Sequence, residues 1–487
     1  MTSQQKDITT RDPAPGPSGD TFGHVEVRGI DFVPPQERRG TPRELFTIWA
    51  ASNVAYIYIV LGGTALLLGL SLWQALAVVV VGNAFWLGVG TLAVSGPAAG
   101  TPSVVIMRSM FGIRGNRVFG AGLNWLIAIS YEAINLSFGS LAAFALAQHL
   151  GITLSTPVKL LIVGVIAVAT FTISIYGHAT IVRLSPFFTS VLIVCCVLLG
   201  VFVFGHAQFD YAPAQPLSGG SLWSALLVGV ALIASAPLSW TVGADYARYL
   251  PESVSKKAVL GWTALGGFVP AVALGIIGVV AGTSVDMNDP QTSLKDILPG
   301  WFYPVFLAVI VVGAITTNVL TTYSSGLCLQ GLGVKMRRSQ TVFIDGVLGG
   351  AITYYALFVA DDFLATLSRW LELTVVVLGP LVAIYATDIV LRRNKYDGRA
   401  LNDERSTSPQ WYTAGFNVAG VTAIILGGVS AGLCIHTASW EGPVAAALGG
   451  ADLSALLGPA VAAAVYVLLT RVVYRPQVPA SYRETSA

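Results

Sequence analysis

The residues best suited to chemistry in this sequence are polar side chains placed inside long apolar runs. They form four clusters, one in each of the runs 45–68, 118–148, 221–247 and 301–329. Burying such groups among apolar residues is costly, so they usually face a cavity or another helix. They are amides, hydroxyls, aromatic rings and a carboxyl, which are groups that bind small polar molecules or cations.

The run 118–148 carries the most specific pattern. Asn124, Tyr131 and Asn135 stand at positions i, i+7 and i+11, which places them on one face of a helix. An aromatic ring and an amide four residues apart can stack on a flat ring and hydrogen-bond to its edge. Glu132 lies beside them, where it could accept N–H groups of such a ring or carry a proton. Alternatively, Glu132 is protonated or paired and only connects helices.

The run 301–329 carries hydroxyl groups. Thr316 and Thr317 are adjacent, and two hydroxyls with a nearby free carbonyl supply the hard oxygen ligands that a small alkali cation requires. Asn318 and Thr322 continue along one face of the same helix. Ser and Thr side chains also bond back to their own helix, so a purely structural role is the alternative.

The other two clusters coincide with expected helix breaks. In the first run, Asn53 and Tyr56 precede two glycines, which favours an interrupted helix, although an interhelical packing seam is the alternative. In the third run, Pro237 lies between Ala236 and Trp240 and removes a backbone hydrogen bond in mid-span. Carbonyls freed by such a break are common binding groups in transporters, whereas a simple proline kink would have no such role.

The elements that must position these clusters are membrane-spanning helices. Apolar residues make up 54% of the 487 positions and charged residues only 11%, whereas a soluble domain carries about a quarter charged residues. A chain this poor in charge cannot cover itself against water, but lipid can solvate it. Segments of about 20 residues, the length that spans a bilayer, recur twelve times. They are 45–68, 71–97, 118–148, 157–177, 183–206, 221–247, 258–283, 301–329, 341–360, 365–391, 411–434 and 452–474.

The charges between these segments alternate. With the N-terminus inside, the inner connections carry groups of Lys and Arg, while the outer connections are nearly free of them and carry Asp and Glu. Excess positive charge on the cytoplasmic side is the rule for membrane helices. We therefore predict a multi-pass protein of the cytoplasmic (inner) membrane with both termini in the cytoplasm. Residues 1–43 and 475–487 would be cytoplasmic tails, the first disordered because it lacks an apolar run.

Several functional classes are disfavoured. A net charge of +2 gives no reason to expect a nucleic-acid partner. There is no nucleotide-binding glycine loop and no HExxH or GxSxG motif, and the histidines and cysteines lack catalytic or metal-ligand spacing. We therefore expect no enzyme, no cofactor and no obligatory protein partner. A secondary transporter of a small polar molecule, embedded in the lipid bilayer, fits best, and a channel is the alternative.

The four clusters fall on the first, third, sixth and eighth predicted spans. The first pairs with the sixth and the third with the eighth under a shift of five, as in a five-plus-five inverted repeat with its site near the repeat interface. The prediction is an all-α polytopic fold of twelve transmembrane helices. Residues 44–400 would form a ten-helix transport core, and residues 401–474 would add helices 11 and 12 outside the repeat.

Four local motifs give the chain a resemblance to a known family. They are Gly100-Thr101-Pro102 followed by Arg108–Asn116, Asn124-Trp125 with Tyr131 and Asn135, Ala244–Pro251, and Thr316-Thr317-Asn318 with Tyr323-Ser324. In this order they resemble the nucleobase–cation symporter family, in its purine–cytosine permease branch. The resemblance implies a LeuT-like fold, alternating access, and import of a nucleobase-like planar heterocycle, cytosine or a purine, by symport with Na⁺ or H⁺.

The resemblance also implies roles for individual residues. Tyr131 would be the stacking aromatic and Asn135 the amide at the ring edge. Thr316 and Thr317 would hold Na⁺ together with the carbonyl of Gly313. The remaining cation ligands would be carbonyls of the first-span break, near Asn53 and Tyr56. The expected substrate-binding set is completed by Glu132, Asn53, Ala236, Trp240, Asn318 and Thr322.

Two departures from the family pattern concern the substrate. The family has a second stacking aromatic near Ala236, where this chain has none, so Trp240 would have to turn inward to replace it. Glu132 stands where an apolar residue is commoner, which favours coupling to protons. A symporter of the same fold for hydantoin, allantoin or a vitamin-like ring is the alternative.

Overall fold

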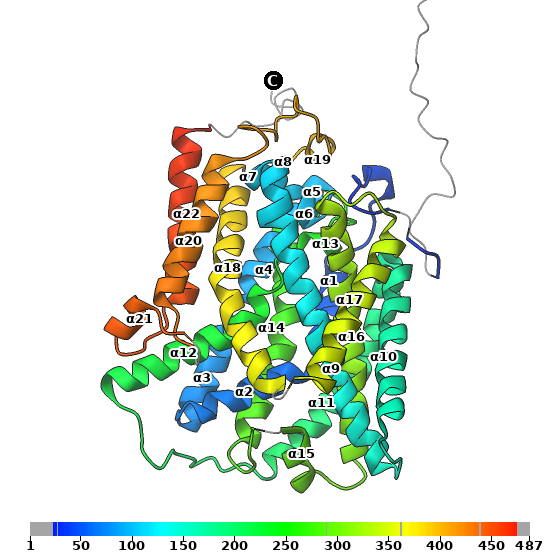
Figure 1. Cartoon of the computed structure of the whole chain (residues 1–487), viewed down its shortest axis with the longest axis vertical. Coiled ribbons are helices and arrows are strands. Elements are labelled where there is room, and N and C mark those ends of the chain that lie inside the picture. Colours follow the sequence, from blue (N-terminus) through cyan, green and yellow to red (C-terminus); the bar gives the residue numbers. More distant parts are fainter. Residues whose placement is uncertain (1–22, 27, 289, 361–362, 438–439, 475–487) are drawn as a thin grey trace, which may run out of the picture.

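The computed structural model describes residues 23–474 apart from 27, 289, 361–362 and 438–439, and it consists of helices joined by short connections (Figure 1). Only two isolated β-bridges occur among these residues. The longer helices are α1 (Arg43–Asn53), α2 (Tyr56–Leu67), α3 (Leu72–Asn83), α4 (Trp86–Ala93), α9 (Leu123–His149), α10 (Thr156–Tyr176), α11 (His178–Phe204), α12 (Gly219–Leu238), α14 (Lys256–Ala281), α16 (Tyr303–Gly331), α17 (Arg338–Phe358), α18 (Phe363–Leu391), α20 (Val418–Cys434) and α22 (Ser454–Val472).

Short helices cap or connect the long ones. They are η1 (Pro35–Glu37), α5 (Ser95–Ala99), α6 (Ser103–Ile106), α7 (Arg108–Phe111), α8 (Ile113–Gly115), η2 (Asn116–Gly122), α13 (Ala244–Ala247), α15 (Pro290–Ser293), η3 (Leu294–Asp296), α19 (Gly398–Leu401) and α21 (Pro443–Ala447).

The predicted all-α membrane architecture is confirmed. Within the described residues, ten helical stretches are long and apolar enough to cross a bilayer, and the bent pair α1 and α2 provides an eleventh span. α20 is a shorter apolar helix of 17 residues. These elements are compatible with the twelve spans that the sequence predicts.

Two spans are interrupted where the sequence predicts breaks. α1 ends at Asn53 and α2 begins at Tyr56, with a bend of 64° between them. Ala55 has an extended backbone, so the helical hydrogen-bond pattern stops there. α12 ends one residue after Pro237, and a turn leads into α13. The first and sixth spans correspond to each other in a five-plus-five repeat, so breaks in both are compatible with the repeat, which stays a prediction.

The helices around these breaks pack closely. α9 and α16 lie side by side at the centre of the bundle, while α14 packs on α1, α2 and α4 (Figure 1). α2 and α14 can approach because glycines face each other: a methyl group added to Gly62 would lie 2.1 Å from the carbonyl oxygen of Gly275. α18, α20 and α22 pack together at one edge. The predicted helices 11 and 12, α20 and α22, therefore lie outside the central bundle.

The two ends of the bundle differ in charge. α7, α8 and α19 lie at one end, which carries Arg108, Arg114 and Arg399 (Figure 1). α15 and α21 lie at the opposite end, whose connections carry Asp296 and Glu441. We call these the basic end and the acidic end. The last described residues, which follow α22, lie at the basic end.

The N-terminal segment, residues 23–42, departs from the prediction of a disordered tail over residues 1–43. Residues 1–22 and 27 lie outside the described structure, but the rest of the segment packs on the basic end of the bundle. Val33 is fully buried, and its amide donates to the carbonyl of Gly100 at 2.8 Å. The Arg38 guanidinium donates to the carbonyl of Pro97 at 2.7 Å. These contacts order the segment. Local composition does not predict them, because the partner residues lie far along the chain.

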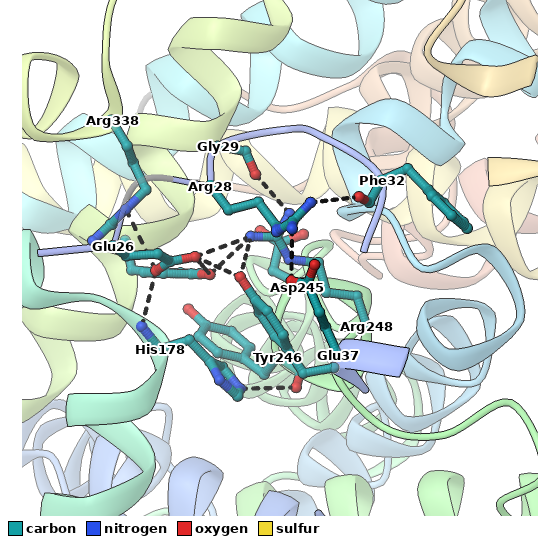
Figure 2. A network of polar contacts seen from close by, with 12 residues as sticks. Glu26, Arg28, Gly29, Phe32, Glu37, His178, Asp245, Tyr246, Arg248 and Arg338 are labelled. Atoms are coloured by element: carbon teal, nitrogen blue, oxygen red, sulfur yellow. Dashed lines mark hydrogen bonds and ion pairs between the residues drawn. The ribbon is translucent and has the colours of Figure 1, made fainter. Parts of the chain in front are cut away.

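Glu26 anchors this segment in a network of buried polar groups (Figure 2). Its carboxylate lies 3.5 Å from Arg248 and 3.5 Å from Arg338, and it accepts the backbone N–H of His178 at 3.0 Å. It also accepts the hydroxyls of Tyr249 at 2.5 Å and Tyr323 at 3.3 Å. One acid therefore ties the segment to the start of α11, the residues after α13, and helices α16 and α17.

Candidate functional site

A central pocket lies where the two broken spans meet α9 and α16. It contains about 640 Å³ of space between atoms, part of it open to solvent. The α1–α2 break, the middle of α9, the end of α12 with the turn after it, and α16 all contribute to its walls. The predicted site residues that line it are Asn53, Tyr131, Asn135, Ala236, Trp240 and Thr317.

Two aromatic rings belong to the walls of this pocket. Tyr131 is half-buried, and its hydroxyl has no hydrogen-bond partner among the described residues. Trp240 lies in the turn that follows Pro237, with its ring edge-to-face on Trp49 at 5.2 Å between centroids. The helix break therefore directs Trp240 into the pocket, although the position near Ala236 holds no aromatic side chain.

Hydrogen bonds hold the side-chain amides of Asn135 and Asn53 in place. Asn135 donates through Nδ2 to Oδ1 of Asn318 at 3.1 Å, and Asn318 donates to the backbone carbonyl of Glu132 at 2.9 Å. Asn53 accepts the hydroxyl of Tyr58 at 2.6 Å and donates to the carbonyl of Trp49 at 2.8 Å. Held in this way, Asn135 presents a fixed edge to whatever occupies the pocket.

Three residues predicted to bind substrate do not line the pocket: Glu132, Asn318 and Thr322. The reason is helix geometry. Neighbouring residues of a helix point about 100° apart, so Glu132 turns away from the face of Tyr131 and lies against Gly349 of α17. Thr322 is on the same side of α16, facing Glu132.

A cluster of oxygens lies beside the pocket, where the end of α1 meets α16. The Thr316 hydroxyl lies 2.9 Å from the carbonyls of both Ala51 and Gly313. The Thr317 hydroxyl lies 2.6 Å from the carbonyl of Ser52 and 2.9 Å from that of Gly313. Such hard oxygen ligands suit an alkali cation.

The helix-end carbonyls in this cluster come from residues that sequence reasoning did not name. Ala51 and Ser52 lie in the last turn of α1, where carbonyls have no partner within the helix. Asn53 contributes to the pocket instead. The Tyr56 ring packs against Phe138 and Phe306, at 5.5 Å and 6.4 Å between centroids, and lines a separate apolar cavity.

Sequence reasoning also missed polar groups in the turn after α12. Ser239 lines the pocket, and the hydroxyl of Thr241 hydrogen-bonds to Oδ1 of Asn124. Pro237 could have indicated them, because the residues that follow a broken helix are exposed to the cavity that the break creates. Asp345 of α17 is a further buried acid, and nothing in the sequence indicates that it lies close to Glu132.

Comparison with known proteins agrees with this geometry. Residues 32–458 match the family described as permeases for cytosine/purines, uracil, thiamine and allantoin. The Bacillus subtilis protein YxlA, assigned as a purine-cytosine permease, is 26% identical over 460 residues, which cover 92% of this chain and 96% of that protein. The purine-cytosine permease fcyB of Emericella nidulans is 27% identical over 482 residues, covering 92% of this chain and 88% of fcyB.

A solved structure shares the fold. Mhp1, a nucleobase-cation-symport-1 family transporter solved in a closed conformation with bromovinylhydantoin bound, superposes with a TM-score of 0.72. It is 17% identical, and the match covers 91% of this chain and 95% of Mhp1. The family match spans both helix breaks, the pocket and the oxygen cluster. The chain therefore belongs to the family of permeases for cytosine/purines, uracil, thiamine and allantoin.

Proposed function

We propose that this membrane transporter imports cytosine or a purine together with a cation. The observation that carries the proposal is that Tyr131, Trp240 and Asn135 line one pocket at the junction of two broken spans. Aromatic faces stack on any nucleobase, and an amide can pair with the ring edge. Relatives named as purine-cytosine permeases match most of the chain, which supports this choice over hydantoin or allantoin.

The coupling cation is Na⁺ or H⁺. For Na⁺, the ligands would be the hydroxyls of Thr316 and Thr317 with the carbonyls of Gly313, Ala51 and Ser52. The cluster joins α1 to α16 beside the pocket, so a cation bound there would favour one arrangement of the broken span. Replacing both threonines with alanine would remove any dependence of uptake on sodium.

The position of the pocket supports transport by alternating access. It lies between the broken spans and α9 with α16, and relative movement of these two groups would open it toward one end or the other. We place the protein in the cytoplasmic membrane with its basic end, and both termini, on the cytoplasmic side.

Uptake by purified protein in proteoliposomes tests this function. Radiolabelled cytosine and adenine should accumulate against their gradients when a cation gradient is imposed. Excess unlabelled cytosine or purine should compete, whereas hydantoin and allantoin should compete weakly. Stronger competition by hydantoin or allantoin would support the alternative substrate class. Flux that never exceeds equilibration under either a sodium or a pH gradient would contradict coupled transport.

A further inference from the structure

Two buried acids face each other outside the pocket. Glu132 of α9 is 1% exposed, and Asp345 of α17 is fully buried. Asp345 lies one helical turn before Gly349 on α17, so the part of α17 that carries Asp345 also meets Glu132, at the junction of α9, α16 and α17. The Glu132 carboxyl lies against Gly349, where an added methyl group would be 3.2 Å from Oε2. The Trp125 indole donates to Oδ1 of Asp345 at 2.8 Å.

The oxygens of this pair are unusually short of partners. Thr322 and Ser325 of α16 face Glu132, and Ser325 also faces Asp345. Yet neither carboxyl oxygen of Glu132, nor Oδ2 of Asp345, nor either hydroxyl completes a hydrogen bond with any described residue. By contrast, the hydroxyls of Thr316 and Thr317 are satisfied by carbonyls. Three of the four carboxyl oxygens of the acid pair are therefore without a hydrogen-bond partner among the described residues.

No cation within the described part of the chain balances the two acids. None of the ion pairs formed by described Lys, Arg or His residues involves Glu132 or Asp345. Cys328 of α16 is a further titratable group close to Asp345. Among the described residues, no charged side chain of α10 acts on Glu132 or Asp345. Two carboxylates in such a place cannot both ionise cheaply, because each is stripped of water and repelled by the other.

We propose that Glu132 and Asp345 share one proton, and that this proton is the coupling ion of transport. The inference rests on the proposed function and specifies its cation. In each cycle the pair takes up one proton from the outer side, forming one O–H bond, and later gives this proton to water on the cytoplasmic side as the substrate leaves. The water that accepts the proton also solvates the two carboxylates that remain, so the pair is doubly ionised only while it is open to the cytoplasm. Intramembrane acids commonly carry protons in this way.

A hydrogen-bond chain connects the backbone of Glu132 to the pocket. Asn135, which lines the pocket, donates to Asn318, and Asn318 donates to the backbone carbonyl of Glu132. A substrate that binds the Asn135 amide would therefore act on the stretch of α9 that carries Glu132. The protonation of the pair would act on the pocket in return, because coupling between two sites is reciprocal.

The test compares wild type, Glu132→Gln and Asp345→Asn in proteoliposomes under a pH gradient alone and a sodium gradient alone. The amide side chains imitate a permanently protonated acid. We expect wild type to accumulate cytosine or adenine under the pH gradient. Both variants should lose this accumulation and still exchange labelled for unlabelled substrate. Thr353→Val is the matched control. It removes a hydroxyl of α17 that donates to the carbonyl of Ala133 on α9, but it changes no acid, so this variant should still accumulate substrate under the pH gradient.

Two outcomes would overturn the proposal: undiminished proton-driven accumulation by either amide variant, or wild-type accumulation that responds only to sodium. Absence of uptake and exchange in wild type would count against the proposed function instead. In that case infrared spectroscopy of the purified protein still tests the pair. A protonated carboxylic acid band at neutral pH should disappear in the Glu132→Gln/Asp345→Asn double variant. Its absence from wild type, or its persistence in the double variant, would refute proton sharing.

Discussion

At the scale of single residues, Tyr131 is the side chain whose ring and hydroxyl can be separated by substitution. Stacking of a base on an aromatic ring contributes about 1–3 kcal/mol, so Tyr131→Ala should raise the KM for cytosine or adenine by roughly tenfold or more. Tyr131→Phe keeps the ring and should stay closer to wild type. Initial uptake rates over a range of substrate concentrations measure both. Equal KM values for Tyr131→Ala and wild type would exclude this ring from the site.

The residues of α9 show what side-chain spacing can and cannot predict. The spacing of Tyr131 and Asn135 predicted a shared face, and both line the pocket. Glu132 was assigned to the same site because it is adjacent in sequence, but adjacent helical residues point in different directions. Asp345 could not be linked to it, since nothing local marks a pair 213 positions apart (345 − 132). The sequence also could not predict that the carbonyls of Ala51 and Ser52 lie in the oxygen cluster, because every residue has a backbone carbonyl.

At the scale of the helices, Gly313 permits the close approach of α16 to the first-span break. A methyl group at this position would lie 2.6 Å from the carbonyl oxygen of Val54, which is backbone and cannot move without shifting the break. Gly313→Ala should therefore lower the melting temperature and reduce uptake. Gly164→Ala on α10 is the control, because an added methyl there meets nothing within 4 Å. It should leave uptake unchanged, and equal behaviour of the two variants would contradict tight packing at the break.

The N-terminal segment should hold the basic end closed through Glu26. Glu26→Ala would leave Arg248 and Arg338 buried without their acid, a change that typically costs about 3–5 kcal/mol. We expect a lower melting temperature and faster alkylation of Cys328, a buried pocket residue, by an impermeant maleimide applied at the basic end. This assay requires a variant that retains Cys328 as its only cysteine.

Glu37→Ala is the matched control for that experiment. Glu37 also belongs to the N-terminal segment and pairs with Arg28, but both side chains are partly exposed, so the pair contributes little. Its melting temperature and Cys328 labelling should resemble those of wild type. If Glu26→Ala labels no faster than Glu37→Ala, the segment does not restrict access to the pocket.

The helix breaks were more predictable than the N-terminal segment. Pro237 and the glycines after Tyr56 leave a local signature, because they change which backbone hydrogen bonds can form. The N-terminal segment has the composition of a tail, and its order depends on Arg248, Tyr323 and Arg338. Such long-range pairing is visible only in the folded chain.

At the scale of the whole molecule, the difference in charge between the two ends predicts its orientation in the membrane. Ser406, in the connection after α19 at the basic end, and Ser218, in the connection before α12, are both exposed. In a cysteine-free variant expressed in intact cells, Ser218→Cys should react with an impermeant reagent added outside. Ser406→Cys should react only after the cells are permeabilised. The opposite labelling pattern would reverse the orientation that the positive-inside rule gives.

The Glu26 network also has a consequence for how the chain is made. During synthesis Glu26 is translated 297 positions before Tyr323, and Arg338 comes later still. With the basic end on the cytoplasmic side, as we propose, the carboxylate would remain on the ribosome side of the bilayer until most of the helices have been inserted. A nascent chain halted before Arg338 would lack the contact between Arg338 and Glu26, so a segment that is translated before most of the helices completes its native contacts after them.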